Sequence, residues 1–183
     1  MTMAKKERKE GLDRLAASIA AAMPDSEGEY RVSEALAEHE RRRFLGIWQV
    51  SEHTVDGRPY VERFAASALR GVDLREPAYA AVYDFREALC LKRVRIGGRV
   101  DTEGGPVVYA YSMGVAISWE LGPGCIYVRP ELGYQASSLG GDPAAVRELG
   151  ASGEAARIAY RFEGEHLFLE EGADLKRLER SAG

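Results

Sequence analysis

Hydrophobic and polar positions follow two different periods along the chain, and the change falls near residue 44. Within residues 5–23 apolar side chains recur three or four positions apart, which predicts an amphipathic helix. The charged segment 33–43 ends in a run of arginines and predicts a second helix, because basic side chains favour a helix C-terminus. The pattern therefore predicts an N-terminal helical arm over residues 1–43.

From residue 44 onward, short apolar runs are separated by turn signals. The Asp-Gly pair of VDGRP, at 55–59, is typical of a β-hairpin, and Gly-rich breaks follow at 97–106 and 121–124. Segment 138–153 is the exception, with a short helical pattern after Pro143. The predicted strands are 44–54, 60–69, 78–86, 88–97, 106–112, 114–121, 125–132, 155–163, 166–171 and 174–180.

These strands follow one another through short loops, with no long crossover. That order favours a mainly β domain over residues 44–183, an antiparallel up-and-down β-barrel of about eight to ten strands. A sandwich of two sheets has most of the same strand signals and stays an alternative.

The segment PVVYAYSMGVAISWEL, at 106–121, alternates most regularly. Its odd positions, from Val107 to Leu121, are large, and its even positions are mostly small. A period of two predicts a strand but does not say which face points inward. A large inward face predicts a filled barrel, whereas a small inward face leaves room for a ligand.

Composition narrows the class of protein. The 183 residues are 45% hydrophobic and 30% charged, with a net charge of −4, which argues against a nucleic-acid-binding protein. No apolar run approaches the ~20 residues of a membrane helix, and acidic residues interrupt the Ala-rich patch near the N-terminus. We therefore expect a cytoplasmic protein in which Cys90 and Cys125 are buried free thiols, although a disulfide between strands stays an alternative.

The stretch FLGIWQV, at 44–50, resembles the first strand of the calycin superfamily, the lipocalins and fatty-acid-binding proteins. That family shares a Gly-X-Trp motif in strand one, with an arginine of the last strand packed over the Trp ring. Here Gly46 and Trp48 would supply the motif, and Arg177 or Arg180 the arginine. The resemblance implies a barrel whose narrow end is closed by the Trp ring.

The closing segment 159–180 is similar to the final strands of bacterial lipocalin-like proteins. The sequence differs from the motifs of these families at two places, and these differences limit what the resemblance implies. Gln49 and Val50 follow the Trp in place of the Asp of the longer lipocalin motif, and the C-terminus lacks the Arg-X-Tyr carboxylate clamp of fatty-acid-binding proteins. The resemblance therefore implies a fold and no particular ligand.

No motif in the sequence assigns catalytic or metal-binding roles. The histidines His39, His53 and His166 have no metal-site spacing, and the Gly-rich segment 97–106 lacks the following helix of a dinucleotide site. His53 and His166 would lie on strands, either at one barrel mouth or separately on the surface. We predict no cofactor, no metal and no catalytic residue.

A basic segment, LKRVRIGGR, is the main candidate for ligand recognition. Arg93 and Arg95 share one strand face, and Lys92 lies on the other with Val94 and Ile96. An outward pair of arginines would be solvated, whereas an inward pair would require an anion. The candidate ligand-binding residues are Tyr83, Phe85, Arg93, Arg95, Tyr109, Tyr111, Trp119 and Tyr127.

Three functions fit these patterns. The first is a non-catalytic barrel that binds a small, partly apolar and, with inward arginines, anionic ligand. The second is an interaction or scaffolding module with a filled barrel, in which the N-terminal helices form homo-oligomers. The third is a barrel-pocket isomerase or lyase, supported only by the histidines and the Arg and Tyr residues.

Overall fold

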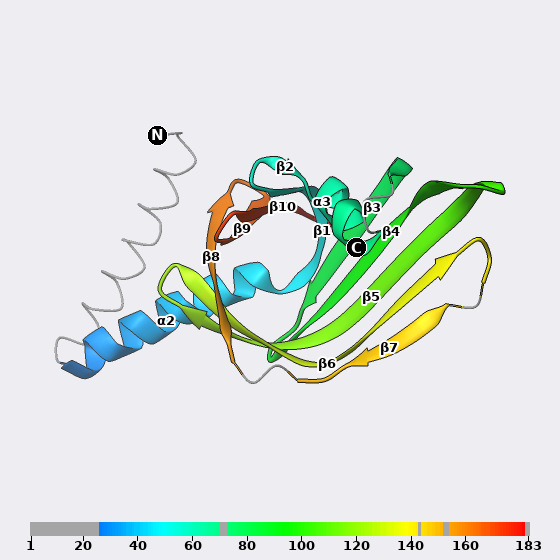
Figure 1. Ribbon diagram of the computed structural model, residues 1–183. Coiled ribbons are helices and arrows are strands. Elements are labelled where there is room, and N and C mark those ends of the chain that lie inside the picture. The colour runs from blue at the N-terminus through cyan, green and yellow to red at the C-terminus, as the bar shows by residue number, and fades with distance from the viewer. Residues whose placement is uncertain (1–25, 70–72, 143, 152–153, 182–183) are drawn as a thin grey trace. The chain divides into compact units, whose positions relative to one another are not determined.

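The computed structural model describes residues 26–69, 73–142, 144–151 and 154–181 (Figure 1). The chain divides into two compact units, Met1–Leu45 and Gly46–Gly183, and each is considered by itself. In the first unit, helix α2 (Ser26–Phe44) ends in basic residues, as the sequence predicts, but begins earlier than expected. The predicted helix at 5–23 lies outside the described residues.

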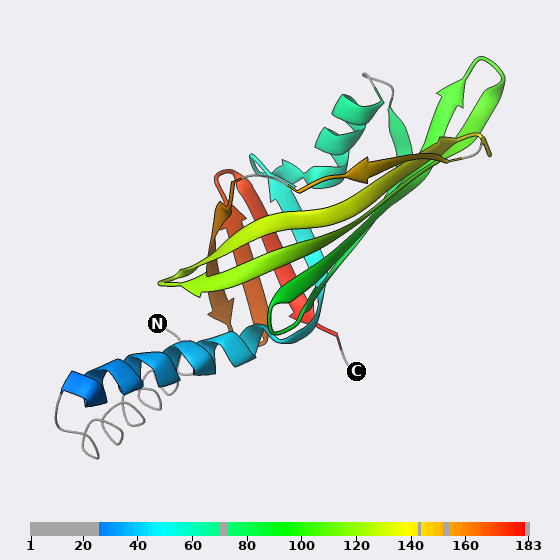
Figure 2. The ribbon, with the colours of Figure 1, turned by 90° about the horizontal axis from the view of Figure 1, so that it is seen from below.

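In the second unit, the described strands form one antiparallel sheet that closes on itself (Figures 1 and 2). Its closed part consists of β1 (Gly46–Val55), β3 (Leu74–Phe85), β4 (Leu89–Thr102), β5 (Gly105–Gly122), β6 (Cys125–Leu139), β8 (Ala156–Glu163), β9 (His166–Glu171) and β10 (Asp174–Arg180). The circuit runs in that order, and β10 pairs with β1 to complete it. Two short strands, β2 (Arg58–Pro59) and β7 (Ala145–Leu149), extend β1 and β6. The predicted up-and-down barrel is confirmed, with eight of the described strands in the closed circuit.

Residues 60–69, predicted as a strand, form helix α3 (Tyr60–Ala68) instead. Apolar residues at Val61, Phe64, Ala65 and Ala68 recur at helical spacing, and so short a run fits either period. Pro59 immediately precedes the helix, where a missing backbone N–H removes no helical hydrogen bond. Of the helices that the structure describes, none has the length and apolar character to cross a membrane.

The other differences lie in β5 and in the 138–153 insertion. The predicted strands 106–112 and 114–121 are one continuous strand, β5. The residues predicted as a short helix after Pro143 form β7, which pairs with β6 over Gly133–Ser137. Pairing along an available strand edge outweighs a weak local helical pattern.

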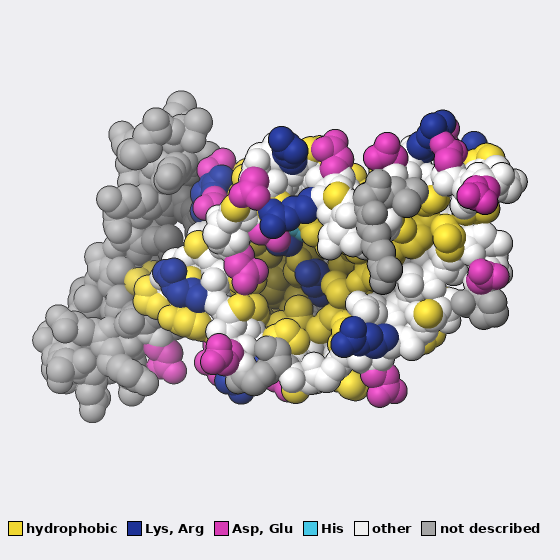
Figure 3. Space-filling model, in the orientation of Figure 1, with side chains coloured by type: hydrophobic (Ala, Val, Ile, Leu, Met, Phe, Trp, Pro, Cys, Tyr) yellow, Lys and Arg dark blue, Asp and Glu magenta, His cyan; other side chains and the backbone are white. Residues whose placement is uncertain are grey.

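The large face of β5 points into the barrel. Tyr109 and Trp119 are 6% and 2% exposed, whereas Val108, on the opposite face, is 63% exposed. Close to Trp119 the interior is filled, and the Phe85 and Trp119 rings meet edge-on at 5.4 Å between centroids. Farther along β5, the inward side chain of Met113 keeps partial exposure. Figure 3 shows a hollow lined by hydrophobic side chains inside the circuit of strands drawn in Figure 1.

The filled end carries the Gly-X-Trp arrangement expected from the sequence. Trp48 is 2% exposed, and the Arg180 guanidinium lies over its ring, 4.7 Å from the centroid. Direct pairing of Trp48 with Arg180 in the β1–β10 ladder brings the two side chains together. Gly46 has a φ of +119°, and an added Cβ would lie 3.3 Å from Nη1 of Arg180. Glycine is thus required where the chain enters β1, because other L-residues are strained at this φ.

We expect Gly46→Ala to lower the free energy of unfolding by about 1–3 kcal/mol, since the methyl group forces a strained backbone conformation. Urea denaturation followed by Trp fluorescence measures the change. Gly97→Ala is the matched control, because its added Cβ would make only an ordinary contact, 3.7 Å from the Tyr109 carbonyl oxygen. That control should stay within about 0.5 kcal/mol of the wild type. Equal stability of the two variants would contradict the account of Gly46.

Candidate functional site

A β-bulge in β1 turns His53 toward the barrel interior. The register of β1 against β10 shifts between Val50 and Glu52, so Val50 pairs with Leu178 and His53 pairs with Lys176. One extra residue in a strand reverses the alternation of faces beyond it. His53 therefore shares the inward face of Val50 although the two positions differ by an odd number.

Strands β1 and β3 stop pairing before His53 is reached, and a side-chain hydrogen bond connects the two strands beyond that point. The last backbone pair of the two strands is Gln49 with Val82. Beyond it, the Tyr79 hydroxyl on β3 lies 2.8 Å from Nδ1 of His53. Tyr60, in the first turn of α3, stacks on the His53 ring at 4.1 Å with planes inclined by 10°. Helix α3 thus contributes to the site through the residue that was predicted to begin a strand.

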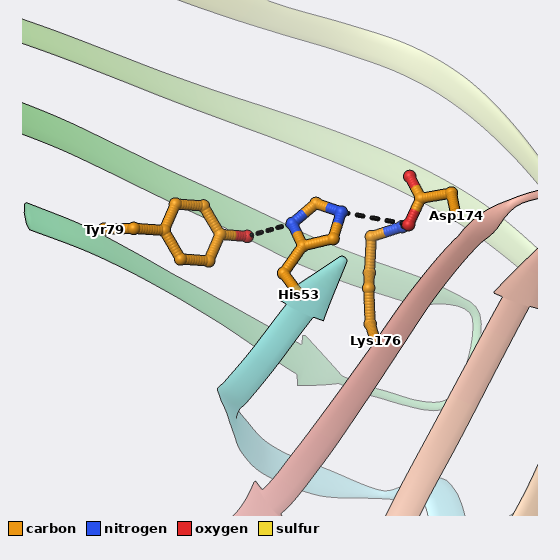
Figure 4. A network of polar contacts seen from close by, with 4 residues as sticks. All are labelled: His53, Tyr79, Asp174 and Lys176. Carbon is orange, nitrogen blue, oxygen red and sulfur yellow. Dashed lines mark hydrogen bonds and ion pairs between the residues drawn. The ribbon is translucent and has the colours of Figure 1, made fainter. Parts of the chain in front are cut away.

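The second nitrogen of His53 is bound to an acidic residue of the last strand (Figure 4). Nε2 lies 2.9 Å from Oδ1 of Asp174, and the same oxygen accepts a hydrogen bond from Nζ of Lys176 at 2.5 Å. The side chains of His53 and Lys176 are 5% and 9% exposed, and that of Asp174 is 28% exposed. Three strands thus bring a tyrosine, a histidine, an aspartate and a lysine into one network.

Burial and charge set the protonation of this network. Burial lowers the pKa of His53 below its usual 6.5, and the hydrogen bond to Asp174 opposes that shift only in part. Burial alone would raise the pKa of Asp174, but bonds from His53 and Lys176 outweigh it and lower the pKa to about 2. Burial raises the pKa of Tyr79 well above its usual value. At neutral pH the network holds an ionised Asp174, a neutral His53 and a neutral Tyr79.

The ionised carboxylate also determines the tautomer of His53. A carboxylate can only accept hydrogen bonds, so Nε2 carries the proton and donates it to Asp174. Nδ1 of His53 is then an acceptor, and the Tyr79 O–H donates to it. The chain of donors runs in one direction, from Tyr79 through His53 to Asp174.

Lys92 is a second cation on the inward face. It pairs with Tyr83 in the β3–β4 ladder, and its ammonium lies 5.6 Å from the centroid of the Tyr83 ring. Lys176 is neutralised by Asp174, but Lys92 has no ion-pair partner in the part of the chain that the structure describes. Charges inside a barrel are costly without a partner, so Lys92 is the candidate anchor for an anionic ligand.

The candidate residues predicted from the sequence divide between the two faces. Five of them point inward: Tyr83, Phe85, Tyr109, Tyr111 and Trp119. Phe85 and Trp119 belong to the filled end, whereas Tyr109 and Tyr111 contact Phe64 of α3, with centroids 6.5 Å and 4.8 Å away. Tyr127 is 42% exposed and pairs with the exposed Glu120, on the outward face.

Arg93 and Arg95 are exposed on the outer face, so of the two orientations that the sequence left open the structure has the outward one. The β3–β4 hairpin pairs Phe85 with Cys90, so odd positions on β3 share a face with even positions on β4. The inward cation of strand β4 is therefore Lys92 rather than either arginine. Its shared face with Val94 and Ile96 was the sequence signal that could have identified it.

The structure also shows the state of the two cysteines and the position of His166. Cys90 and Cys125 are both buried and free, and burial raises the pKa of the Cys90 thiol to about 12. His166 does not join His53, because its Nε2 lies 2.7 Å from a guanidinium nitrogen of Arg177. Arg177 is thus not the arginine over Trp48.

No sequence signal indicated Tyr79, Asp174 or Lys176, because their roles depend on which strands pair.

Comparison with known proteins assigns no family. No protein-family model matches the chain, and neither a curated protein nor a solved structure matches it. The function must therefore be argued from the barrel and from the chemistry of its own side chains.

We expect Asp174→Asn to reduce the loss of stability as the pH falls from about 4 to about 2. In the wild type both His53 and Asp174 have lower pKa values folded than unfolded, so the unfolded chain binds more protons and acid destabilises the fold. The Asp174 contribution is complete above about pH 4 and is lost as the pH falls toward about 2. Thermal unfolding midpoints measured between pH 7 and about pH 2 give the dependence of stability on pH for the wild type and for Asp174→Asn.

Asp101→Asn removes the same charge from a half-exposed position and controls for net charge. The variant Asp174→Asn should also be less stable at neutral pH, because it leaves buried Lys176 without its carboxylate. An unchanged acid slope in Asp174→Asn would contradict the assignment of the lowered pKa to Asp174.

Proposed function

We propose that this chain is a calycin-like β-barrel that binds a small, partly apolar anion in its interior, with Lys92 as the anchor for the charge. The single observation that carries the proposal is the position of Lys92, an inward cation without an ion-pair partner among the described residues. A carboxylate or similar group would supply that partner through a charge-assisted hydrogen bond.

The walls around Lys92 fit the apolar part of such a ligand. Tyr83 lies beneath the ammonium, and farther along the inward face of β5 the Tyr111 ring packs on Phe64 of α3. Tyrosine rings present an apolar surface with a polar tip, which suits an amphipathic molecule. The hollow in Figure 3, lined by hydrophobic side chains with a basic side chain among them, supports the same class of ligand.

Support for a calycin-like barrel comes from the filled end. Gly46, Trp48 and Arg180 have the arrangement that the resemblance implies, with the guanidinium over the ring. The closed circuit of strands is compatible with the same superfamily. Neither observation names a ligand, so recognition rests on the interior side chains alone.

Octanoate and 1-octanol, which differ chiefly in charge, test the proposal by isothermal titration calorimetry. The wild type should bind octanoate more tightly than 1-octanol. Lys92→Met, which keeps most of the length of the side chain and removes its charge, should weaken octanoate binding by about tenfold or more. The affinity for 1-octanol should change little.

Arg93→Met is the matched control, because it removes a positive charge from the adjacent, outward position. It should bind both probes like the wild type. Equal affinity of the wild type for octanoate and 1-octanol, or an equal effect of the two substitutions, would contradict an anion site at Lys92.

A further inference from the structure

The Tyr79 end of the Tyr79–His53–Asp174 chain is the end at which a bound ligand can exchange a proton with His53. Both nitrogens of His53 are occupied, and its side chain is only 5% exposed, so the imidazole cannot contact a ligand directly. The Tyr79 oxygen, in contrast, donates its proton to His53 and keeps lone pairs with which it can accept another. A proton taken up by Tyr79 can therefore pass to Nδ1 as the original proton leaves the oxygen.

This exchange avoids a charged tyrosine. Burial makes ionisation of Tyr79 unfavourable, but in a concerted transfer the phenol gains one proton as it gives up another and remains neutral. The positive charge arises on His53 instead, where the ionised carboxylate of Asp174 stabilises it at 2.9 Å. His53 and Asp174 thus act through Tyr79 as positioning residues.

Lys92 lies on the same inward face of the β3–β4 ladder as Tyr79, because it pairs with Tyr83, four residues from Tyr79 on β3. Its charge contributes to lowering the pKa of His53 and opposes the rise in the pKa of Tyr60, the ring stacked on His53. An ammonium in this position can stabilise negative charge that develops on a ligand oxygen during proton abstraction. A base and a cation around one aromatic-walled space are the two components required to form an enolate.

We infer that Tyr79 transfers protons to and from the carbon next to the carbonyl of a bound 2-oxo acid, so that the barrel catalyses keto–enol interconversion. The inference rests on the proposed anion site, since Lys92 holds the charged end of the substrate. An apolar or aromatic substituent on the 2-oxo acid would lie against the tyrosine rings.

The step balances without a cofactor. The C3–H bond of the 2-oxo acid breaks, its proton binds the Tyr79 oxygen, and the phenolic proton moves to Nδ1 of His53. The C–H electron pair becomes the C2–C3 π bond while the carbonyl π pair moves onto oxygen, beside the Lys92 ammonium. The proton then returns from His53 through Tyr79, either to the oxygen, which gives the enol, or to carbon.

The pH dependence follows from the groups that face His53. These are Asp174 and Lys176 on β10, Tyr79 on β3, Lys92 on β4 and Tyr60 on α3. Only neutral His53 can accept the relayed proton, so the rate should rise from acid to neutral pH with a midpoint below 6.5. Because Asp174 raises the pKa of His53, Asp174→Asn should move that midpoint to lower pH.

Phenylpyruvate is the probe, and the test measures two quantities on the full chain. Exchange of its C3 protons in D₂O is followed by ¹H NMR against the same buffer without protein, and its affinity is measured by calorimetry. The wild type should accelerate exchange. Tyr79→Phe should lower the protein-dependent rate about 100-fold or more, with an affinity within about threefold of the wild type.

Tyr134→Phe is the matched control, because it removes a hydroxyl from a tyrosine that is 50% exposed on the outer face, and it should leave the rate unchanged. The inference would be overturned if phenylpyruvate bound but its C3 protons exchanged no faster than in buffer. It would also be overturned if Tyr79→Phe exchanged these protons at the wild-type rate. Octanoate binding without phenylpyruvate exchange would overturn only the proton transfer. Loss of both would overturn the anion site as well. Should Tyr79→Phe fail to fold, an unmoved midpoint in Asp174→Asn would overturn the relay.

Discussion

The antiparallel pairing of β1 with β10 closes the barrel, and both ends of the interior depend on it. At one end this ladder places Trp48 beside Arg180, and at the other it places His53 beside Lys176 and within reach of Asp174. The partners come from opposite ends of the domain, so neither arrangement exists until the sheet has closed. Closure also removes the exposed strand edges that an open sheet of this order would leave on β1 and β10.

The interior combines two environments that have different energetic consequences. Near Trp48 and Trp119 the side chains are apolar or aromatic, fully packed, and stabilise the fold by removing their surfaces from water. Around His53 the barrel instead encloses Lys176, Asp174 and the hydroxyl of Tyr79. Burying such groups opposes folding unless each finds a partner, and an apolar filling would be the more stable choice. A polar cluster retained at this cost is the reason to look for function at this end of the barrel.

Helix α3 completes the barrel wall where β1 and β3 stop pairing. Strands β1 and β3 stop pairing after Gln49 and Val82, which leaves their remaining backbone groups without each other as partners. Tyr60 and Phe64 of α3 pack against His53 and Tyr111 at this split, so the helix brings two rings to the wall of the site. The result is a barrel wall that is part sheet and part helix at the end where the charged residues lie.

The sequence by itself determined most of the strands and their order. Period-two alternation and the Asp-Gly turn are local signals, and they sufficed for the up-and-down barrel. The contact of Trp48 with a C-terminal arginine was expected from the resemblance that the Gly-X-Trp motif carries. The same signals could not distinguish a short helix from a strand at 60–69, because a run of that length fits both periods.

Only the tertiary structure decided which side chains face inward, because strand register depends on pairing between distant segments. One hairpin register placed Lys92 inside and Arg93 outside, and one bulged residue turned His53 inward. The bonds of His53 to Tyr79 and Asp174 span 26 and 121 residues of sequence. No local pattern encodes such separations, so the site exists only where the closed barrel brings three strands together.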